Sequence, residues 1–115
     1  MSVIIYHNPK CSKSRQTLKL LIDQGIKPSI IEYLKTPPTQ KKIKEILKKL
    51  VYIPRDLIRK KETTYTELNL KNPSLTDAAL IKIMVKYPIL IERPIVLANK
   101  KAAIGRPPEQ VLEIL

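Results

Sequence analysis

Two short apolar runs with one helical segment between them constrain the fold of this chain more than any other feature. Residues 3–6 (VIIY) and 29–33 (SIIEY) are rich in β-branched side chains, which is typical of strands. Between them Leu18, Leu21 and Ile22 recur at the spacing of one helix face. A strand, a helix and a second strand predict a parallel strand pair joined by a right-handed crossover.

The middle of the chain predicts helices. One segment carries a single apolar stripe that contains Ile43, Ile46, Leu47 and Leu50. A short helix is expected at about 54–61, and a further one between the start signals at 73–76 and about residue 86. These segments predict a helical insertion at about residues 39–86.

The end of the chain predicts a hairpin followed by a helix. Residues 95–98 (IVLA) and 102–104 (AAI) are expected to be strands around a turn at Asn99-Lys100. Two prolines at the start of 107–115 suit the first turn of a last helix. The order β-α-β, helices, β-β-α is the plan of an α/β, thioredoxin-like fold with a mixed sheet. We therefore expect one domain, residues 1–115, that carries the helical insertion.

Composition limits where the chain works and what it contacts. No apolar run approaches the ~20 residues that span a bilayer, and the first residues hold too short an apolar stretch for a signal peptide. A single cysteine cannot form an internal disulfide, so the expected location is the cytoplasm. The net charge is +12, with cationic residues concentrated in 41–61. This basic stretch is typical of a solvated helix face, and it also suits an acidic partner, a nucleic acid or an anionic substrate.

The single cysteine, Cys11, lies where the first strand turns into the first helix. A helix N-terminus lowers the pKa of a thiol because its free N–H groups and its dipole favour the thiolate, and the same position binds oxyanions. Neighbouring lysines and an arginine add positive charge, and Ser12 and Ser14 offer hydrogen-bond donors. The alternative is an inert buried cysteine, although such a residue is more typical of an apolar run.

Cys11 and Ser14 form a C-x-x-S pattern in place of C-x-x-C. The second thiol of C-x-x-C resolves a covalent intermediate by forming a disulfide, which a serine cannot do. Thiol chemistry therefore needs an outside thiol, such as glutathione or a glutaredoxin-type protein. His7, the only histidine, is either structural or a hydrogen-bonding or electrostatic neighbour of the thiol. One histidine and one cysteine do not predict a metal site, and no bound cofactor is expected.

Several motifs, in order along the chain, resemble one known family. They are YHNPKCSKSR at 6–15, ELNL at 67–70, ERPIV at 92–96 and IGRPPEQVLEIL at 104–115. Over residues 3–115 the chain resembles the ArsC family of glutaredoxin-coupled arsenate reductases, and in particular its short, YfgD-like branch. The resemblance implies a thioredoxin-like fold with a helical insertion, in agreement with the predicted order of elements.

The resemblance also implies a reaction. Cys11 matches the family's nucleophile, which forms a covalent thiol–arsenate adduct. Three arginines match the residues that bind the substrate oxyanion: Arg59, Arg93 and Arg106. His7 and Ser14 match positions that support thiol activation. Glutathione, the external reductant, then attacks the adduct, glutaredoxin reduces the mixed disulfide, and arsenite leaves. The implied enzyme is an oxidoreductase, a glutathione- and glutaredoxin-dependent arsenate reductase.

Arginine suits the role that the resemblance gives it. Guanidinium groups bind tetrahedral oxyanions bidentately and stay charged at any working pH. Each of the three arginines lies beside a predicted helix or a proline-fixed turn. The resemblance further implies a cis peptide bond between Arg93 and Pro94.

Two other functions are compatible with the sequence. The ArsC superfamily includes Spx-type regulators that bind RNA polymerase, and the basic stretch at 41–61 suits an acidic protein partner, although those regulators typically carry C-x-x-C. The second alternative is a thiol-dependent oxidoreductase that acts on another oxyanion or on a disulfide substrate. No specific nucleic acid is expected as a partner, because the chain shows no recognition motif and few aromatic residues for stacking. No membrane partner is expected either.

Overall fold

The computed structural model describes residues 2–115, which cluster into two compact units. One unit contains the chain up to Thr36 together with Arg93–Leu115, and the other contains Pro37–Glu92. The expected organisation as one domain with an inserted helical segment stays a prediction. None of the helices formed by residues 2–115 is long and apolar enough to cross a membrane.

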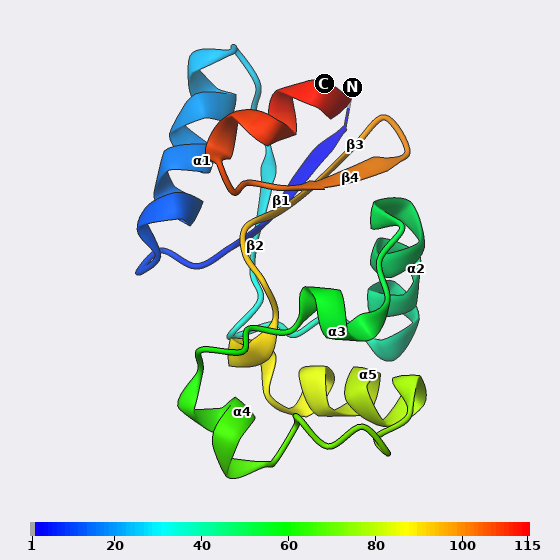
Figure 1. Cartoon of the computed structure of the whole chain (residues 1–115). Helices are drawn as coiled ribbons and strands as arrows, with labels where there is room; N and C mark the ends of the chain where they lie inside the picture. Colours follow the sequence, from blue (N-terminus) through cyan, green and yellow to red (C-terminus); the bar gives the residue numbers. More distant parts are fainter. Residues whose placement is uncertain (1) are drawn as a thin grey trace. The chain divides into compact units, whose positions relative to one another are not determined.

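The first unit is built on a four-stranded mixed sheet (Figure 1). Its strands are β1 (Val3–His7), β2 (Ser29–Glu32), β3 (Ile95–Ala98) and β4 (Lys101–Ile104), in the order β2-β1-β3-β4. β1 and β2 are parallel, with His7 opposite Glu32, whereas β3 is antiparallel to both β1 and β4. The structure confirms the predicted parallel pair, the predicted hairpin and the mixed sheet of the predicted fold class.

One face of this sheet is covered by α1 (Ser12–Asp23) and by the 3₁₀ helix η2 (Pro108–Ile114). Their side chains pack with strand residues in one apolar cluster, which contains Val3, Ile5, Leu21, Val96, Ala98, Val111 and Ile114. Burial of each large apolar side chain contributes about 1.5–3 kcal/mol. η2 corresponds to the predicted last helix, and it has 3₁₀ geometry over Pro108–Ile114.

The inner face of α1 is shifted from the one that its apolar residues predict, although Leu21 is buried and Leu18 packs against the core as expected. Its buried residues are Ser14, Thr17 and Leu21. Ile22, predicted to point inward with Leu21, is 56% exposed. The prediction is wrong for Ile22 because the start of the inner face carries two small hydroxyl residues, whose polar contacts belong to the site described below.

The β3–β4 hairpin turns at Asn99 and Lys100, as the sequence predicts. Both residues have positive φ, which is the backbone of a type I′ turn and matches the twist of the strands. The Asn99 side-chain amide donates to the Ile114 carbonyl at 2.8 Å. This contact ties the turn to η2 and supports a turn whose second residue is not the usual glycine.

The second unit is helical. It contains α2 (Gln40–Leu50), α3 (Pro54–Leu57), α4 (Thr63–Glu67), α5 (Asp77–Lys86) and the 3₁₀ helix η1 (Pro88–Leu90). α5 packs against α2 and α3 (Figure 1). The predicted apolar stripe of α2 is confirmed for Ile43, Ile46 and Leu47, which are buried. Thr39 and Thr76 cap α2 and α5 by accepting a backbone N–H in the first turn.

The helix predicted for 54–61 ends earlier, at Leu57. Ile58 is extended and forms an isolated antiparallel bridge with Ile91. Backbone hydrogen bonds of 2.7 and 2.8 Å flank the bridge. Pairing with a segment that is distant in the sequence therefore overrides the local helical tendency.

Val51 holds a backbone conformation that a β-branched residue rarely adopts. It ends α2 with φ 57° and ψ 45°, and its side chain is 90% exposed. The left-handed conformation costs an L-residue about 1–2 kcal/mol, whereas glycine adopts it freely and loses about 0.5–1 kcal/mol of additional chain entropy. Because the exposed side chain contributes little packing, we expect Val51→Gly to stabilise the fold by about 1 kcal/mol.

Thermal unfolding followed by circular dichroism measures this change, and about 1 kcal/mol corresponds to a rise of roughly 4–8 °C in Tm. Val51→Ala is the matched control, because it shortens the side chain but keeps the Cβ atom. Its stability should stay close to that of the native protein. A Val51→Gly variant no more stable than Val51→Ala would contradict the prediction.

Candidate active site

The predicted nucleophile lies at the mouth of α1, where Cys11 is the N-cap residue and is partly buried. Asn8 fixes the turn before it through three hydrogen bonds of 3.0 Å. Its carbonyl accepts the Cys11 N–H, its Oδ1 accepts the Lys10 N–H, and its N–H donates to Ser14 Oγ. Asn8 is absent from the predicted site, although an asparagine followed by a proline is a signal for a turn.

The surroundings of Cys11 favour its thiolate. Burial raises the pKa of the thiol, but the backbone N–H of Ser14, the Arg93 guanidinium and the backbone N–H of Lys13 more than offset this effect. The pKa of Cys11 therefore lies below its ordinary value. The two N–H groups belong to the first turn of α1, where backbone donors have no partner within the helix. Because the thiolate is the nucleophilic form of cysteine, the position suits covalent catalysis.

Two of the three predicted oxyanion-binding arginines lie next to Cys11. Arg93 lies before β3 and Arg106 lies after β4, so the open end of one hairpin carries both. Arg106 Nη2 is 3.6 Å from Cys11 Sγ, and Arg106 Nε donates to the Arg93 carbonyl at 2.7 Å. The peptide bond between Arg93 and Pro94 is cis, as the resemblance implies, and so is the bond between Arg106 and Pro107. This arrangement presents positive charge directly beside a thiolate.

His7 and Ser14 form a buried polar pair behind the Cys11 turn. His7 Nδ1 and Ser14 Oγ share a hydrogen bond of 2.6 Å, and Ser14 Oγ also accepts the Asn8 N–H. The Ser14 hydroxyl thus forms hydrogen bonds with β1 and the turn, and the Ser14 backbone N–H is one of the groups that lower the pKa of Cys11. Burial lowers the pKa of His7 although the Glu32 carboxylate opposes this effect, so His7 is neutral at pH 7. A role of His7 and Ser14 in thiol activation stays a prediction. In the structure, the hydrogen bond with Ser14 gives His7 a contact that positions the start of α1.

Gly105 is required by close packing that no sequence pattern reveals. A Cβ atom at this position would overlap Thr17 Oγ1 and would lie 2.7 Å from Pro94 Cγ. The Gly105 N–H donates to the Pro94 carbonyl at 3.0 Å, which ties together the two segments at the open end of the hairpin. Gly105 and the fully buried Thr17 therefore bring α1, with Cys11 at its start, against both arginine-bearing segments.

The third predicted arginine, Arg59, lies in the second unit. Its Nε donates to Glu62 at 3.0 Å and its Nη1 donates to Glu92 at 2.7 Å. The Arg59 side chain is only 18% exposed. Two carboxylates therefore fix the orientation of this guanidinium within its own unit. The role of Arg59 as an oxyanion ligand stays a prediction.

Replacing Arg93 by alanine is expected to raise the pKa of Cys11, because a guanidinium that favours the thiolate is lost. The ultraviolet absorbance of the thiolate, or the pH dependence of alkylation by iodoacetamide, measures this pKa. Arg15→Ala is the matched control, since Arg15 is exposed, donates to the Pro9 carbonyl and is not among the groups that shift the pKa of Cys11. An equal rise in both variants would contradict the assignment.

Comparison with known proteins agrees with this geometry. The model of the ArsC family matches residues 6–114. The uncharacterized protein YfgD of Escherichia coli is 55% identical over 114 residues, which cover 98% of this chain and 96% of that protein. The arsenate reductase of Haemophilus influenzae is 52% identical over 116 residues, with 100% of both chains covered. The solved structure of an arsenate reductase from Vibrio cholerae has a TM-score of 0.97 and 55% identity, and the match covers 100% of this chain and 98% of that one.

These matches extend over both units and include every motif on which the resemblance was based. The likeness to the Vibrio cholerae structure also confirms the thioredoxin-like fold class. With its sequence and its backbone both matched from end to end, the chain belongs to the ArsC family.

Proposed function

We propose that this protein is an arsenate reductase that forms a covalent adduct between Cys11 and arsenic and depends on glutathione and glutaredoxin for turnover. The observation that carries the proposal is the position of Arg106 Nη2, 3.6 Å from the Cys11 sulfur. A guanidinium this close holds an oxyanion against the nucleophile and stays charged at any working pH. The relatives named arsenate reductase in Haemophilus influenzae and Vibrio cholerae support the same substrate.

In the first step the Cys11 thiolate attacks the arsenic atom of arsenate. An S–As bond forms as one As–O bond breaks, and the departing oxygen takes up a proton and leaves as water. The product is a thiol–arsenic(V) adduct, so no electrons have yet moved to arsenic. Arg93 and Arg106 stabilise the negative oxygens through charge-assisted hydrogen bonds, and Arg59 is proposed as the third arginine ligand.

In the second step an outside thiol is needed, because the chain has one cysteine and Ser14 stands where a second thiol would resolve the adduct. The glutathione thiolate attacks the Cys11 sulfur. An S–S bond forms as the S–As bond breaks, and the bonding electron pair stays on arsenic, which leaves as arsenite in the arsenic(III) state. Oxidation of two thiol sulfurs to one disulfide balances this two-electron reduction. Glutaredoxin then attacks the glutathione sulfur of the mixed disulfide and releases the Cys11 thiolate.

The proposal is tested by incubating the full chain with arsenate, glutathione and glutaredoxin and measuring arsenite. We expect arsenite formation that saturates with arsenate and that stops when both thiol reagents are omitted. An absence of arsenite in the complete mixture would overturn the proposal. Undiminished multiple turnover without any outside thiol would overturn the resolving step.

A further inference from the structure

A recess of about 170 Å³ opens beside the turn that holds Cys11. The buried residues His7 and Asn8 line it, together with the more exposed residues Lys10, Glu32, Leu34 and Lys35. We call it the His7 recess. It lies entirely within the first unit, at the ends of the parallel strands β1 and β2.

The wall of the His7 recess is the turn that positions the nucleophile. Lys10 lines the recess and immediately precedes Cys11, so the Cα atoms of the two residues are about 3.8 Å apart. The hydrogen bonds of Asn8 to Lys10, Cys11 and Ser14 hold this wall in one conformation. The turn that lines the recess therefore continues directly into the residue whose sulfur an outside thiol must reach.

The charges of the His7 recess fit a small thiol that carries two carboxylates and one ammonium group. Lys10 and Lys35 supply two cations, and Glu32 supplies one anion. Lys35 Nζ lies 3.7 Å from Glu32 Oε1, a spacing that suits the adjacent ammonium and carboxylate of an amino acid head group. With His7 neutral, the recess carries one net positive charge, opposite to the net charge of glutathione. Leu34, which is 38% exposed, adds an apolar contact for the methylene groups of the ligand.

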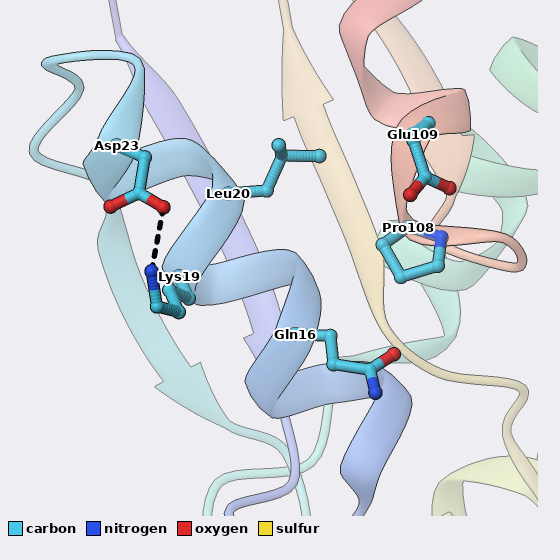
Figure 2. A pocket seen from close by; sticks show the side chains of 6 residues that line it. All are labelled: Gln16, Lys19, Leu20, Asp23, Pro108 and Glu109. Atoms are coloured by element: carbon cyan, nitrogen blue, oxygen red, sulfur yellow. Dashed lines mark hydrogen bonds and ion pairs between the residues drawn. The ribbon is translucent and has the colours of Figure 1, made fainter.

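A second recess, of about 230 Å³, carries charge of the opposite sign. Figure 2 shows its lining, with Gln16, Lys19, Leu20 and Asp23 on α1 and with Pro108 and Glu109 across from them. Asp23 and Glu109 supply two anions against the single cation of Lys19, which is paired with Asp23 at 2.8 Å (Figure 2). This recess repels an anionic thiol, and it begins at Gln16, more than one helical turn beyond Cys11.

We propose that the His7 recess binds glutathione, with the γ-glutamyl head group against Glu32 and Lys35 and the glycine carboxylate against Lys10. This inference rests on the proposed function, because it locates the thiol that resolves the Cys11 adduct. The sulfur of the bound glutathione reaches the Cys11 sulfur past Lys10. The S–S bond then forms as the S–As bond breaks, with arsenite as the leaving group.

Binding is tested without turnover by titrating S-methylglutathione, which has no free thiol, into the isotope-labelled full chain and following the amide resonances. We expect saturable shifts at Asn8, Lys10 and residues 32–35, with a Kd on the order of millimolar. Lys35→Glu should weaken binding about tenfold, because an attractive contact becomes repulsive. Lys19→Glu is the matched control: it makes the same change of net charge in the other recess and should leave binding unchanged.

The arsenite assay gives a second readout. Lys35→Glu should raise the KM for glutathione about tenfold and leave the KM for arsenate unchanged. With β-mercaptoethanol, an uncharged thiol, the native protein and Lys35→Glu should react at equal rates. A rise in the KM for both substrates would show a structural effect and would overturn the assignment.

The outcomes separate this inference from the proposed function. Resonance shifts confined to Gln16–Asp23, or no shifts at all, would overturn the His7 recess as the glutathione site even if arsenite forms. The same holds if Lys35→Glu and Lys19→Glu weaken the binding of S-methylglutathione equally. If S-methylglutathione binds in the His7 recess but no arsenite forms, the proposed reaction is overturned, whereas the recess is supported as the glutathione site.

Discussion

Replacing Cys11 by serine is expected to abolish arsenite formation, with a fall in rate of roughly 10⁴-fold or more. A serine hydroxyl is not ionised at neutral pH and needs an adjacent base to become a nucleophile. The only histidine, His7, forms its hydrogen bond with Ser14 instead. The chain has no other thiol that could replace Cys11. The arsenite assay measures the loss, and mass spectrometry of arsenate-treated protein reports whether the adduct forms.

Ser12→Ala is the matched control for this experiment, because Ser12 is the exposed first residue of α1 and follows Cys11 directly. Its rate should stay close to the native rate. Circular dichroism should show the same fold for Cys11→Ser, since serine has the same side-chain shape with a smaller terminal atom and Cys11 is only partly buried. Arsenite formation by Cys11→Ser at the native rate would remove Cys11 from the mechanism.

Gly105→Ala should damage the site through packing alone. The added methyl group would overlap Thr17 Oγ1 and crowd Pro94 Cγ, so α1 or the segment before β3 must move. Either movement changes the distance between Cys11 and its two neighbouring arginines. A misplacement of about 1 Å costs on the order of 10²-fold in rate, and overpacking costs about 1–3 kcal/mol of stability.

Steady-state kinetics with arsenate and urea unfolding measure the two effects of Gly105→Ala. Gly25→Ala is the matched control. Gly25 has φ +78° and open space around it, so alanine there should cost about 1 kcal/mol of stability but should leave kcat/KM unchanged. Adding Thr17→Ala to Gly105→Ala should restore part of the activity, because it removes the overlapping hydroxyl. Native kinetics in Gly105→Ala would show that the packing around Thr17 does not position the site.

The local part of the site could be predicted from the sequence. A β-branched run, a turn with proline and a helix place Cys11 at a helix N-terminus, and the structure has it as the N-cap of α1. The backbone N–H groups of Lys13 and Ser14, which lower the pKa of its thiol, belong to the same local geometry, whereas Arg93, which also lowers it, does not. The proximity of Arg93 and Arg106 to Cys11 depended on the resemblance, because nothing local connects residues so far apart in the sequence.

Features that depend on distant packing could not be predicted. Ser14 and Thr17 take the inner face of α1 because they contact β1, the turn and the hairpin segments, while the apolar Ile22 is left exposed. Ile58 leaves the predicted helix because it pairs with Ile91. In both cases a tertiary contact outweighs a local pattern, and such contacts are not visible in hydrophobic periodicity.

The hydrogen bond from Arg106 Nε to the Arg93 carbonyl has a consequence for affinity. An arginine side chain carries about 2 kcal/mol of rotamer entropy, which binding of an anion would normally have to restrict. Here the carbonyl orients the guanidinium during folding, before any ligand arrives. The entropy is therefore lost once, when the chain folds, and does not weaken each binding event. For the oxyanion proposed above, the hairpin would thus be a preorganised receptor, in which the fixed guanidinium governs affinity as well as position.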